Sequence, residues 1–268
     1  MKKLINFLIV IRKKFFLFLN IRIEITKIKR DDSKFYKNYP IKSLDKKAFI
    51  NVGAGKFRHK FWTNVDYSSG QYAKYQDKNV VNYNLMSKKR MPFKTESIEA
   101  IYSAHCIEHI SNEAAKYIFK EFYRILKKDG FLRIQCADAD LIYNSYRTRN
   151  IDYWREVIED YKNDKNVNID FDVESLMLHM IGSQTKNNGR FSKININRKF
   201  RDVSKEKFLD YLISESKFDE KKTYRHINWF NFEKLEKFAK QAKFKDCFRS
   251  MPHGSFCLPM RNKNLFDS

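Results

Sequence analysis

The chain has 268 residues, of which 43% are hydrophobic and 16% aromatic. This composition excludes a disordered chain, and the length fits one domain with an attached lobe. The net charge of +22 has two explanations. One is an anionic partner, such as nucleic acid, an acidic membrane surface or a phosphorylated substrate; the other is a surface on which lysine is simply the usual residue. The four cysteines lack the spacing of a disulfide framework or a zinc ribbon, which favours a reducing, cytoplasmic location.

The first 22 residues are apolar but are interrupted by three basic residues at 12–14. No unbroken run therefore reaches the roughly 18 residues that a membrane-spanning helix needs. On a helix, most of the lysines and asparagines of this segment fall on one arc, which predicts a basic amphipathic helix. Such a helix could lie on the anionic inner face of a membrane or pack on the protein itself or a partner. A polar, lysine-rich linker is expected to follow.

The core begins with a short apolar run at 48–52 that ends in Gly53 and Gly55, which predicts a buried strand and a tight turn. A second short strand ends at Asp66. Cofactors that contain adenosine need such a pair of features, because the glycine turn admits the charged middle of the cofactor and the carboxylate accepts hydrogen bonds from the ribose. Only about a dozen residues separate Gly53 from Asp66, against about 20 in a standard dinucleotide fold. The connecting helix is therefore expected to be one turn or absent.

Strands and helices alternate through the rest of the core, which predicts a parallel sheet covered on both faces. The helix at 112–126 is expected to open at Ser111 and to stop at Lys127 to Gly130, with the glycine past its end. Three more strands are predicted, at 80–85, 100–103 and 131–136.

Asp138 and Asp140 follow the fifth predicted strand. They are explained either as the cap of the next helix, which is favoured, or as ligands of a divalent metal. Beyond them, helices are predicted at 141–161, 173–181 and 232–244, with a loop at 182–190 and basic stretches at 190–201 and 217–225. The segment 255–258 is a poor strand candidate, so the last strand of the sheet is expected to be missing or displaced.

Several motifs occur in order along the core: Asn-Val-Gly-Ala-Gly at 51–55, Phe-Trp-Thr-Asn-Val-Asp at 61–66, Met-Pro-Phe at 91–93, and Tyr-Ser-Ala-His-Cys-Ile-Glu-His-Ile at 102–110. Their order and spacing resemble the class I S-adenosylmethionine-dependent methyltransferases, in particular the bacterial type 11-like group with a short glycine loop. The resemblance implies a Rossmann-like α/β fold with a shortened first helix. Four regions are then expected: an N-terminal helix and linker (1–46), the cofactor-binding core (47–140), a helical insertion or acceptor lid (141–231) and the last helix with a C-terminal strand region (232–268).

The resemblance also implies which residues bind S-adenosylmethionine. Gly53 and Gly55 would let the backbone approach the methionine end, and Asp66 would hold the ribose hydroxyls. Asn84, with the backbone of Leu85, would meet the adenine edge. The sequence departs from the family where Asn51 replaces a frequent acidic residue and Asn84 replaces a frequent aspartate. The full expected set is Asn51, Gly53, Ala54, Gly55, Asp66, Asn84, Leu85, Ser103 and Ala104, and no metal ligand is expected.

Methyl transfer needs a base only where the acceptor must lose a proton. The candidates at the end of the fourth strand are His105, which is preferred, with Glu108 and His109. The favoured activity is O-methylation of a small molecule, sugar or glycolipid, and nucleic acid is a less favoured acceptor. Two alternatives remain at this stage. His105, Glu108 and His109 spell the His-x-x-Glu-His motif of a zinc hydrolase, and the changed acidic positions would also fit a catalytically degenerate, cofactor-binding scaffold module.

Overall fold

The computed structural model describes residues 32–69, 73–74, 79–162, 170–251, 254–262 and 265–266. The chain forms two compact units, residues 1–37 and 38–268. The described part of the first unit contains a short helix, α2 (Ser33–Tyr36). The amphipathic helix predicted for residues 1–22 lies outside the described residues. The second unit opens with helix α3 (Ile41–Asp45). None of the helices in the described ranges is long and apolar enough to cross a membrane.

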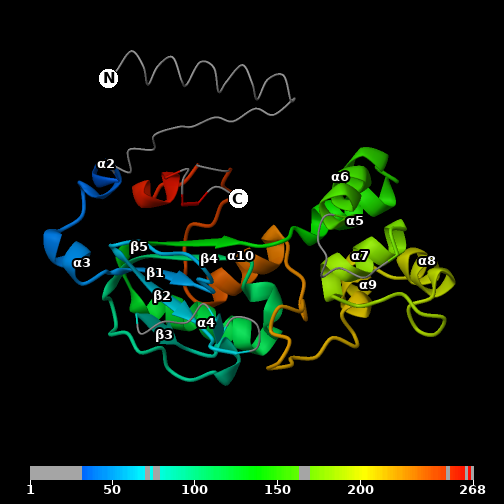
Figure 1. The fold of residues 1–268 in the computed structure, drawn as a ribbon, viewed down its shortest axis with the longest axis horizontal. Coiled ribbons are helices and arrows are strands. Elements are labelled where there is room, and N and C mark those ends of the chain that lie inside the picture. The colour runs from blue at the N-terminus through cyan, green and yellow to red at the C-terminus, as the bar shows by residue number, and fades with distance from the viewer. Residues whose placement is uncertain are drawn as a thin grey trace, which may run out of the picture. The chain divides into compact units, whose positions relative to one another are not determined.

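The second unit is built on a parallel sheet of five strands in the order β3-β2-β1-β4-β5 (Figure 1). The strands are β1 (Phe49–Val52), β2 (Trp62–Asp66), β3 (Val80–Asn82), β4 (Ile98–Ala104) and β5 (Leu126–Gln135). Every residue of the central strand β1 is buried, as expected where a parallel sheet is covered on both faces. The predicted Rossmann-like α/β class is therefore confirmed.

The connection from β1 to β2 contains no helix, because residues 53–61 form only turns and irregular backbone. The shortened first crossover predicted from the Gly53–Asp66 spacing is thus confirmed. The third strand is shorter than predicted and ends at Asn82. Asn84 ends the extended backbone because its side-chain oxygen accepts a hydrogen bond from the Met86 N–H (2.8 Å), which starts a short 3-10 helix, η2 (Leu85–Ser87).

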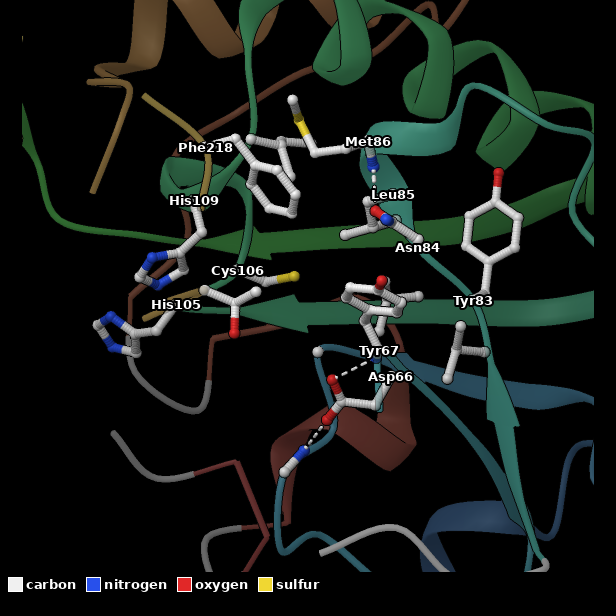
Figure 2. A pocket seen from close by; sticks show the side chains of 16 residues that line it. Asp66, Tyr67, Tyr83, Asn84, Leu85, Met86, His105, Cys106, His109 and Phe218 are labelled. Atoms are coloured by element: carbon white, nitrogen blue, oxygen red, sulfur yellow. Dashed lines mark hydrogen bonds between the residues drawn. The ribbon is translucent and has the colours of Figure 1, made fainter. Parts of the chain in front are cut away.

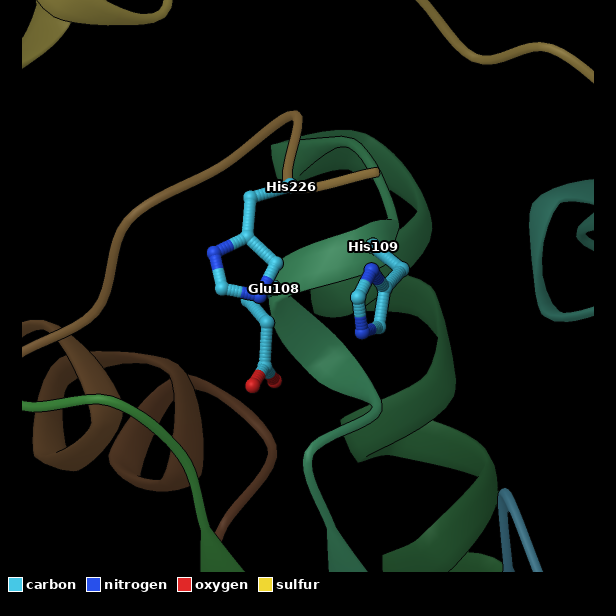
Figure 3. Close-up of side chains that lie close together, drawn as sticks. All are labelled: Glu108, His109 and His226. Atoms are coloured by element: carbon cyan, nitrogen blue, oxygen red, sulfur yellow. The ribbon is translucent and has the colours of Figure 1, made fainter. Parts of the chain in front are cut away.

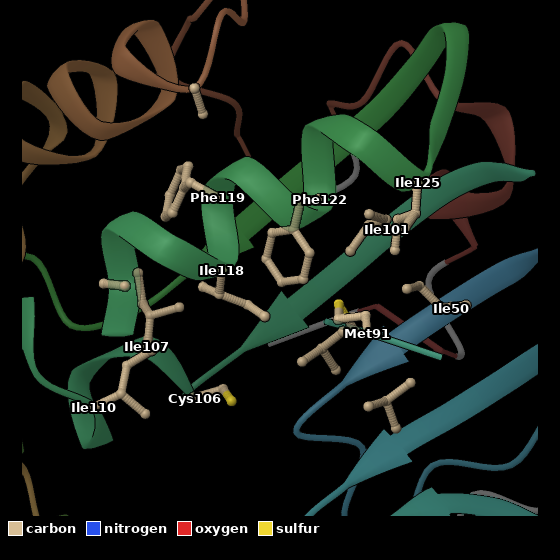
Figure 4. Packing of buried hydrophobic residues seen from close by; sticks show 14 of the residues in the cluster. Ile50, Met91, Ile101, Cys106, Ile107, Ile110, Ile118, Phe119, Phe122 and Ile125 are labelled. Atoms are coloured by element: carbon tan, nitrogen blue, oxygen red, sulfur yellow. The ribbon is translucent and has the colours of Figure 1, made fainter. Parts of the chain in front are cut away.

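Helix α4 (Asn112–Ile125) packs its apolar face on the sheet, and Ser111 caps it by accepting a hydrogen bond from the Ala114 N–H (3.2 Å). Its side chains Ile118, Phe122 and Ile125 meet Ile50 of β1 and Ile101 of β4 in the main core (Figure 4). Helix α10 (Phe232–Gln241) joins the same core. The sequence therefore predicted both helices that cover this face of the sheet.

The predicted end of α4 lies within one residue of the observed end, but the glycine stop predicted after it is not formed. The helix ends at Ile125, and Leu126 already pairs with Ile98 as the start of β5. The next pair is Ala100 with Phe131, so β4 advances by two residues while β5 advances by five. The turn-like run from Lys127 to Gly130 is accommodated as a bulge inside the strand, rather than as a separate helix stop.

Five helices form a second core beyond the ends toward which the strands point (Figure 1). They are α5 (Ala139–Arg147), α6 (Ile151–Lys162), α7 (Val173–Gly182), α8 (Lys193–Asp202) and α9 (Lys205–Leu212). The single helix predicted at 141–161 is two helices, since Arg149 between them takes a positive φ of 52°. The sequence predicts only a basic stretch where α8 forms, because Ile196 is the one buried side chain of this helix in the described structure.

Among the described residues, the other face of the sheet is covered by aromatic side chains rather than by long helices. Phe266 lies against Trp62 and Tyr102, with ring centroids 5.1 and 4.8 Å apart, after the 3-10 helix η4 (Leu258–Arg261). No strand follows β5 among the described residues, which include 245–251 and 254–262. The absence of a strand in these residues agrees with the expectation that the last strand of the sheet is missing or displaced.

Candidate functional site

A pocket opens at the carboxyl ends of β1, β2 and β4 and encloses about 690 Å³ of space that is open to solvent (Figure 2). A ligand crevice is expected at this edge of an open parallel sheet. The pocket brings together seven residues predicted from the sequence: Gly53, Gly55, Asp66, Asn84, Leu85, His105 and His109. Its remaining walls come from residues that the sequence did not single out: Val52, Val65, Tyr67, Tyr83, Met86, Cys106, Ile110, Phe218 and Thr223.

The two glycines of the loop after β1 serve different purposes. Gly53 has a φ of 72°, and a Cβ there would lie 2.6 Å from the Cys106 sulfur, so only glycine lets the loop pack this closely. Gly55 has a φ of 48°, and a Cβ there would meet nothing within 4 Å. The backbone at Gly55 is therefore open to a ligand, whereas Gly53 holds the loop down on the end of β4.

Asp66 ends β2 and anchors this loop. Its Oδ2 accepts a hydrogen bond from the Gly55 N–H, and its Oδ1 accepts one from the Tyr67 N–H, both at 2.7 Å (Figure 2). A carboxylate has about four acceptor positions, so two remain for the two hydroxyls of a ribose. Burial raises the pKa of Asp66, and the hydrogen bonds from Gly55 and Tyr67 only partly oppose this effect.

The opposite wall suits an adenine ring. Asn84 and Leu85 lie beside the apolar side chains of Tyr83, Met86 and Phe218 (Figure 2). Phe218 comes from the loop that precedes α10, far along the sequence from the strands. Glycines that admit a close approach, a carboxylate with two remaining acceptor positions and an apolar wall together fit S-adenosylmethionine.

The other four residues of the expected cofactor set do not line the described pocket wall. Asn51 is 4% exposed and Ser103 is 1% exposed, and both are interior strand residues. Ala54 is buried in the loop, where its N–H reaches the Val65 carbonyl at 3.3 Å. Ala104 is the last residue of β4. Their expected contact with the cofactor therefore stays a prediction, which the pocket wall does not support.

His105 follows β4 in a strained conformation, with a φ of 47°. This left-handed geometry costs a residue with a side chain about 1–2 kcal/mol, and such strain is typical of functional sites. The His105 N–H donates to the Gln135 carbonyl at 2.9 Å, and the side chain is 61% exposed. Its Nδ1 lies 3.4 Å from Glu108 Oε1. The interaction with Glu108 raises the pKa of His105, and partial burial opposes this.

Glu108 lies behind His105, with 2% of the residue exposed, in a single 3-10 turn, η3 (Ile107–His109). Burial acts to raise the pKa of Glu108, but His105, His109 and His226 together hold it below its ordinary value. The zinc-hydrolase motif needs both histidines on one face of an α-helix. His105 precedes the short turn that carries His109, so this arrangement is not formed.

His226 joins this group from the loop before α10. The Ile227 and Asn228 N–H groups both donate to the Glu108 carbonyl, at 2.9 and 3.1 Å, which fixes the loop against η3. The rings of His109 and His226 are 4.9 Å apart between centroids. Burial, helped by the neighbouring His109, lowers the pKa of His226. The sequence drew attention to His226 through its place before the last helix, but gave no sign that it meets Glu108.

Asp138 and Asp140 have structural partners. Asp138 caps α5 by accepting a hydrogen bond from the Asp140 N–H at 2.9 Å, as the favoured explanation predicted. Asp140 pairs with Lys205 at 2.8 Å and accepts hydrogen bonds from Asn231. The two carboxylates are thus already engaged by protein groups, which gives no support to a metal site between them.

Comparison with known proteins agrees with this geometry. Residues 51–134 match a family model described as a methyltransferase domain. A search of curated proteins finds no match. Among solved structures, the chain is similar to a candidate S-adenosyl-L-methionine-dependent methyltransferase from Methanococcus maripaludis. That similarity has 14% identity and a TM-score of 0.24 and covers 53% of this chain and 86% of the other, which is too distant to add to the assignment. Residues 51–134 therefore carry a methyltransferase domain, which supports a class I enzyme that uses S-adenosylmethionine as its methyl donor.

Proposed function

We propose that this enzyme methylates a hydroxyl oxygen of a small molecule, a sugar or a glycolipid. The observation that carries the proposal is the pair formed by His105 and Glu108. His105 lies on the pocket wall with an exposed ring, and the buried Glu108 carboxylate is 3.4 Å from its Nδ1. A hydroxyl acceptor must lose a proton during methyl transfer, and an imidazole positioned by a carboxylate is suited to take it.

When bound, S-adenosylmethionine supplies a methyl group carried on a positively charged sulfur. The thioether that remains after transfer is a good leaving group. Asp66, the glycine loop and the apolar wall at Leu85 and Phe218 would hold it. His105 would accept the proton of the acceptor hydroxyl, and Glu108 would orient the imidazole and stabilise its protonated form. Most of the rate enhancement would come from positioning, because the displacement needs the three reacting atoms in line.

The acceptor is proposed to enter beside the loop that precedes α10. Phe218 and Thr223 of this loop line the pocket, and Glu220 accepts a hydrogen bond from the Tyr67 hydroxyl at 3.2 Å. His226 ties the same loop to α7, since its N–H donates to Ser183 Oγ at 2.8 Å. These contacts support a role for residues 141–231 as an acceptor-binding lid. A cytoplasmic enzyme that meets anionic membrane through residues 1–22 would suit a glycolipid acceptor.

The test is a transfer assay with S-adenosylmethionine labelled in its methyl group. Separate reactions would offer sugars and nucleotide sugars, glycolipid vesicles, small phenols and alcohols, and RNA. We expect label in an oxygen-linked methyl group of one of the first three classes. His105→Ala should lower kcat by about 10²–10⁴-fold, the usual contribution of a general base, with little change in cofactor affinity. His59→Ala, which removes a histidine outside the pocket wall, is the matched control.

Three results would overturn the proposal. Labelled RNA would point to a nucleic-acid methyltransferase, and an unchanged kcat in folded His105→Ala would remove the proposed base. If the protein bound S-adenosylhomocysteine but transferred no label to any class of acceptor, the scaffold alternative would replace methyl transfer.

A further inference from the structure

Three side chains from two distant segments converge beside the pocket. Glu108 and His109 come from η3, and His226 comes from the loop before α10 (Figure 3). One potential ligand atom from each of the three lies within 4.8 Å of the other two. The two backbone hydrogen bonds to the Glu108 carbonyl hold the segments together, so the cluster is built into the fold.

Both imidazoles are oriented in the way that metal-binding histidines usually are. His109 Nδ1 lies 3.0 Å from the Arg225 carbonyl oxygen, and His226 Nδ1 lies 2.6 Å from the Met180 carbonyl oxygen. A carbonyl oxygen can only accept, so each Nδ1 carries the proton. The Nε2 atom of each neutral ring then has a lone pair for a ligand. A backbone carbonyl on the second ring nitrogen is the arrangement that fixes the tautomer in metal sites.

The third member of the cluster is a buried carboxylate that the protein leaves without a hydrogen bond. Neither Glu108 Oε1 nor Oε2 has a hydrogen-bond partner, although the residue is only 2% exposed. His105 Nδ1 is the ion-pair contact of Oε1, at 3.4 Å. Buried polar groups are nearly always hydrogen-bonded, so two carboxylate oxygens without a hydrogen bond call for a partner. Two unsatisfied oxygens beside two oriented imidazoles indicate that a cation completes the group.

We propose that Glu108, His109 and His226 bind one divalent transition-metal ion. Two imidazoles and one carboxylate favour zinc, iron, cobalt or nickel over magnesium or calcium, which prefer sites made of oxygen. Three protein ligands also leave coordination positions open, as in catalytic rather than structural metal sites. Ligand atoms around such an ion lie about 3–3.5 Å apart, given metal–ligand bonds of about 2.1 Å. The present spacing of up to 4.8 Å is wider than this, so metal binding would draw the three side chains together.

The place of the site suggests its use. His109 lines the cofactor pocket, and His105 lies beside the cluster on the same wall. An open metal position here would be filled by an oxygen of the acceptor, whose proton would then be easier to remove. This use depends on the proposed O-methylation, whereas metal binding by the three residues does not. Metal binding can therefore be tested without cofactor, acceptor or turnover.

The experiment is a titration of the untagged, chelator-treated full chain with Co²⁺, followed by the visible absorbance of the bound ion. Zn²⁺ competition and a Mg²⁺ titration accompany it. We expect one Co²⁺ per chain, displacement by Zn²⁺ and no competition by Mg²⁺. His226→Ala, His109→Ala and Glu108→Gln should each weaken binding at least tenfold, in line with the loss of a ligand. His59→Ala should bind as the wild type does, and circular dichroism would check that each variant is folded.

Failure of the folded wild type to bind Co²⁺ would overturn the proposal. So would unchanged affinity in both His109→Ala and Glu108→Gln, even if His226→Ala did not fold. In that case ordered water, rather than an ion, would satisfy Glu108. A protein that binds Co²⁺ through these residues but not S-adenosylhomocysteine would keep the metal site and remove the proposed function.

Discussion

Replacing Asp66 by asparagine tests the cofactor site most directly, because the change keeps the size of the side chain and removes its charge. The carboxylate already accepts hydrogen bonds from Gly55 and Tyr67, one on each oxygen. The two remaining acceptor positions match the two ribose hydroxyls. In Asp66→Asn, the amide nitrogen must replace one oxygen, so it faces a backbone N–H and can no longer accept a hydrogen bond.

The magnitude follows from the bonds that are lost. A hydrogen bond to a charged group contributes about 1.5–3 kcal/mol, and at least one ribose bond is removed. We therefore expect the Kd for S-adenosylhomocysteine to rise about 10–150-fold, since about 1.4 kcal/mol corresponds to a factor of ten. Asp66→Ala should weaken binding more, because it also releases the Gly55 loop.

The assay is calorimetric titration of wild-type and variant protein with S-adenosylhomocysteine, with Asp45→Asn as a control outside the pocket. Thermal unfolding would show that each variant is folded. An unchanged Kd in folded Asp66→Asn would refute the placement of the ribose at this carboxylate. Loss of binding in Asp45→Asn as well would mean that any reduction of negative charge weakens binding, so the effect would not be specific to the site.

Three further results are expected. First, affinity for S-adenosylhomocysteine should fall as the pH is lowered through the pKa of Asp66, because only the ionised carboxylate accepts hydrogen bonds from both hydroxyls. Burial raises this pKa above its ordinary value near 3.8. Titrations from pH 7 to 4.5 should show the fall in affinity for the wild type and not for Asp66→Asn. Gly53→Ala should lower the free energy of unfolding by about 2–4 kcal/mol in urea, from a positive φ and a clash with Cys106, and a cost no larger than about 1 kcal/mol would contradict the close packing. Glu121 is 7% exposed and accepts hydrogen bonds from Arg124 and from the Met91 N–H. Glu121→Gln should therefore lower the free energy of unfolding by about 2–3 kcal/mol at pH 7. Pairing with Arg124 lowers the pKa of Glu121 in the folded protein. The difference in free energy of unfolding between wild type and Glu121→Gln should therefore be present above the ordinary pKa near 4.5 and shrink as the pH falls through the lower pKa of the folded state. A difference that is constant with pH would contradict the ion pair.

The local sequence determined most of the core. Short runs of four to six residues predicted the five strands, and the short distance from Gly53 to Asp66 predicted a crossover without a helix. Ser111 and the apolar spacing after it predicted α4, because caps and periodicity act over a few residues. The glycine loop and Asp66 meet in the structure because the ends of neighbouring parallel strands must lie at one edge of the sheet.

Features that depend on competing or distant contacts were missed. The run Lys127 to Gly130 has the composition of a helix stop, yet pairing of Leu126 with Ile98 draws it into β5 as a bulge. Helix α8 has a single buried side chain among its described residues, so its sequence carries little periodic signal. Asn51 and Ser103 are buried by the pleat of the sheet and its covering layers, so their predicted place in the cofactor site stays a prediction that the pocket wall does not support.

Sequence alone thus determined the class of fold and the cofactor, and it predicted Asp66 as the carboxylate for the ribose, since these follow from motifs whose residues are close in the chain. Only the tertiary structure decided which side chains complete the site. Phe218 reaches the pocket wall beside Leu85, and His226 reaches Glu108, from a loop more than 80 residues after the last strand. The physical reason is that backbone hydrogen bonds from Ile227 and Asn228 to the Glu108 carbonyl place this loop, and such bonds leave no pattern in the sequence.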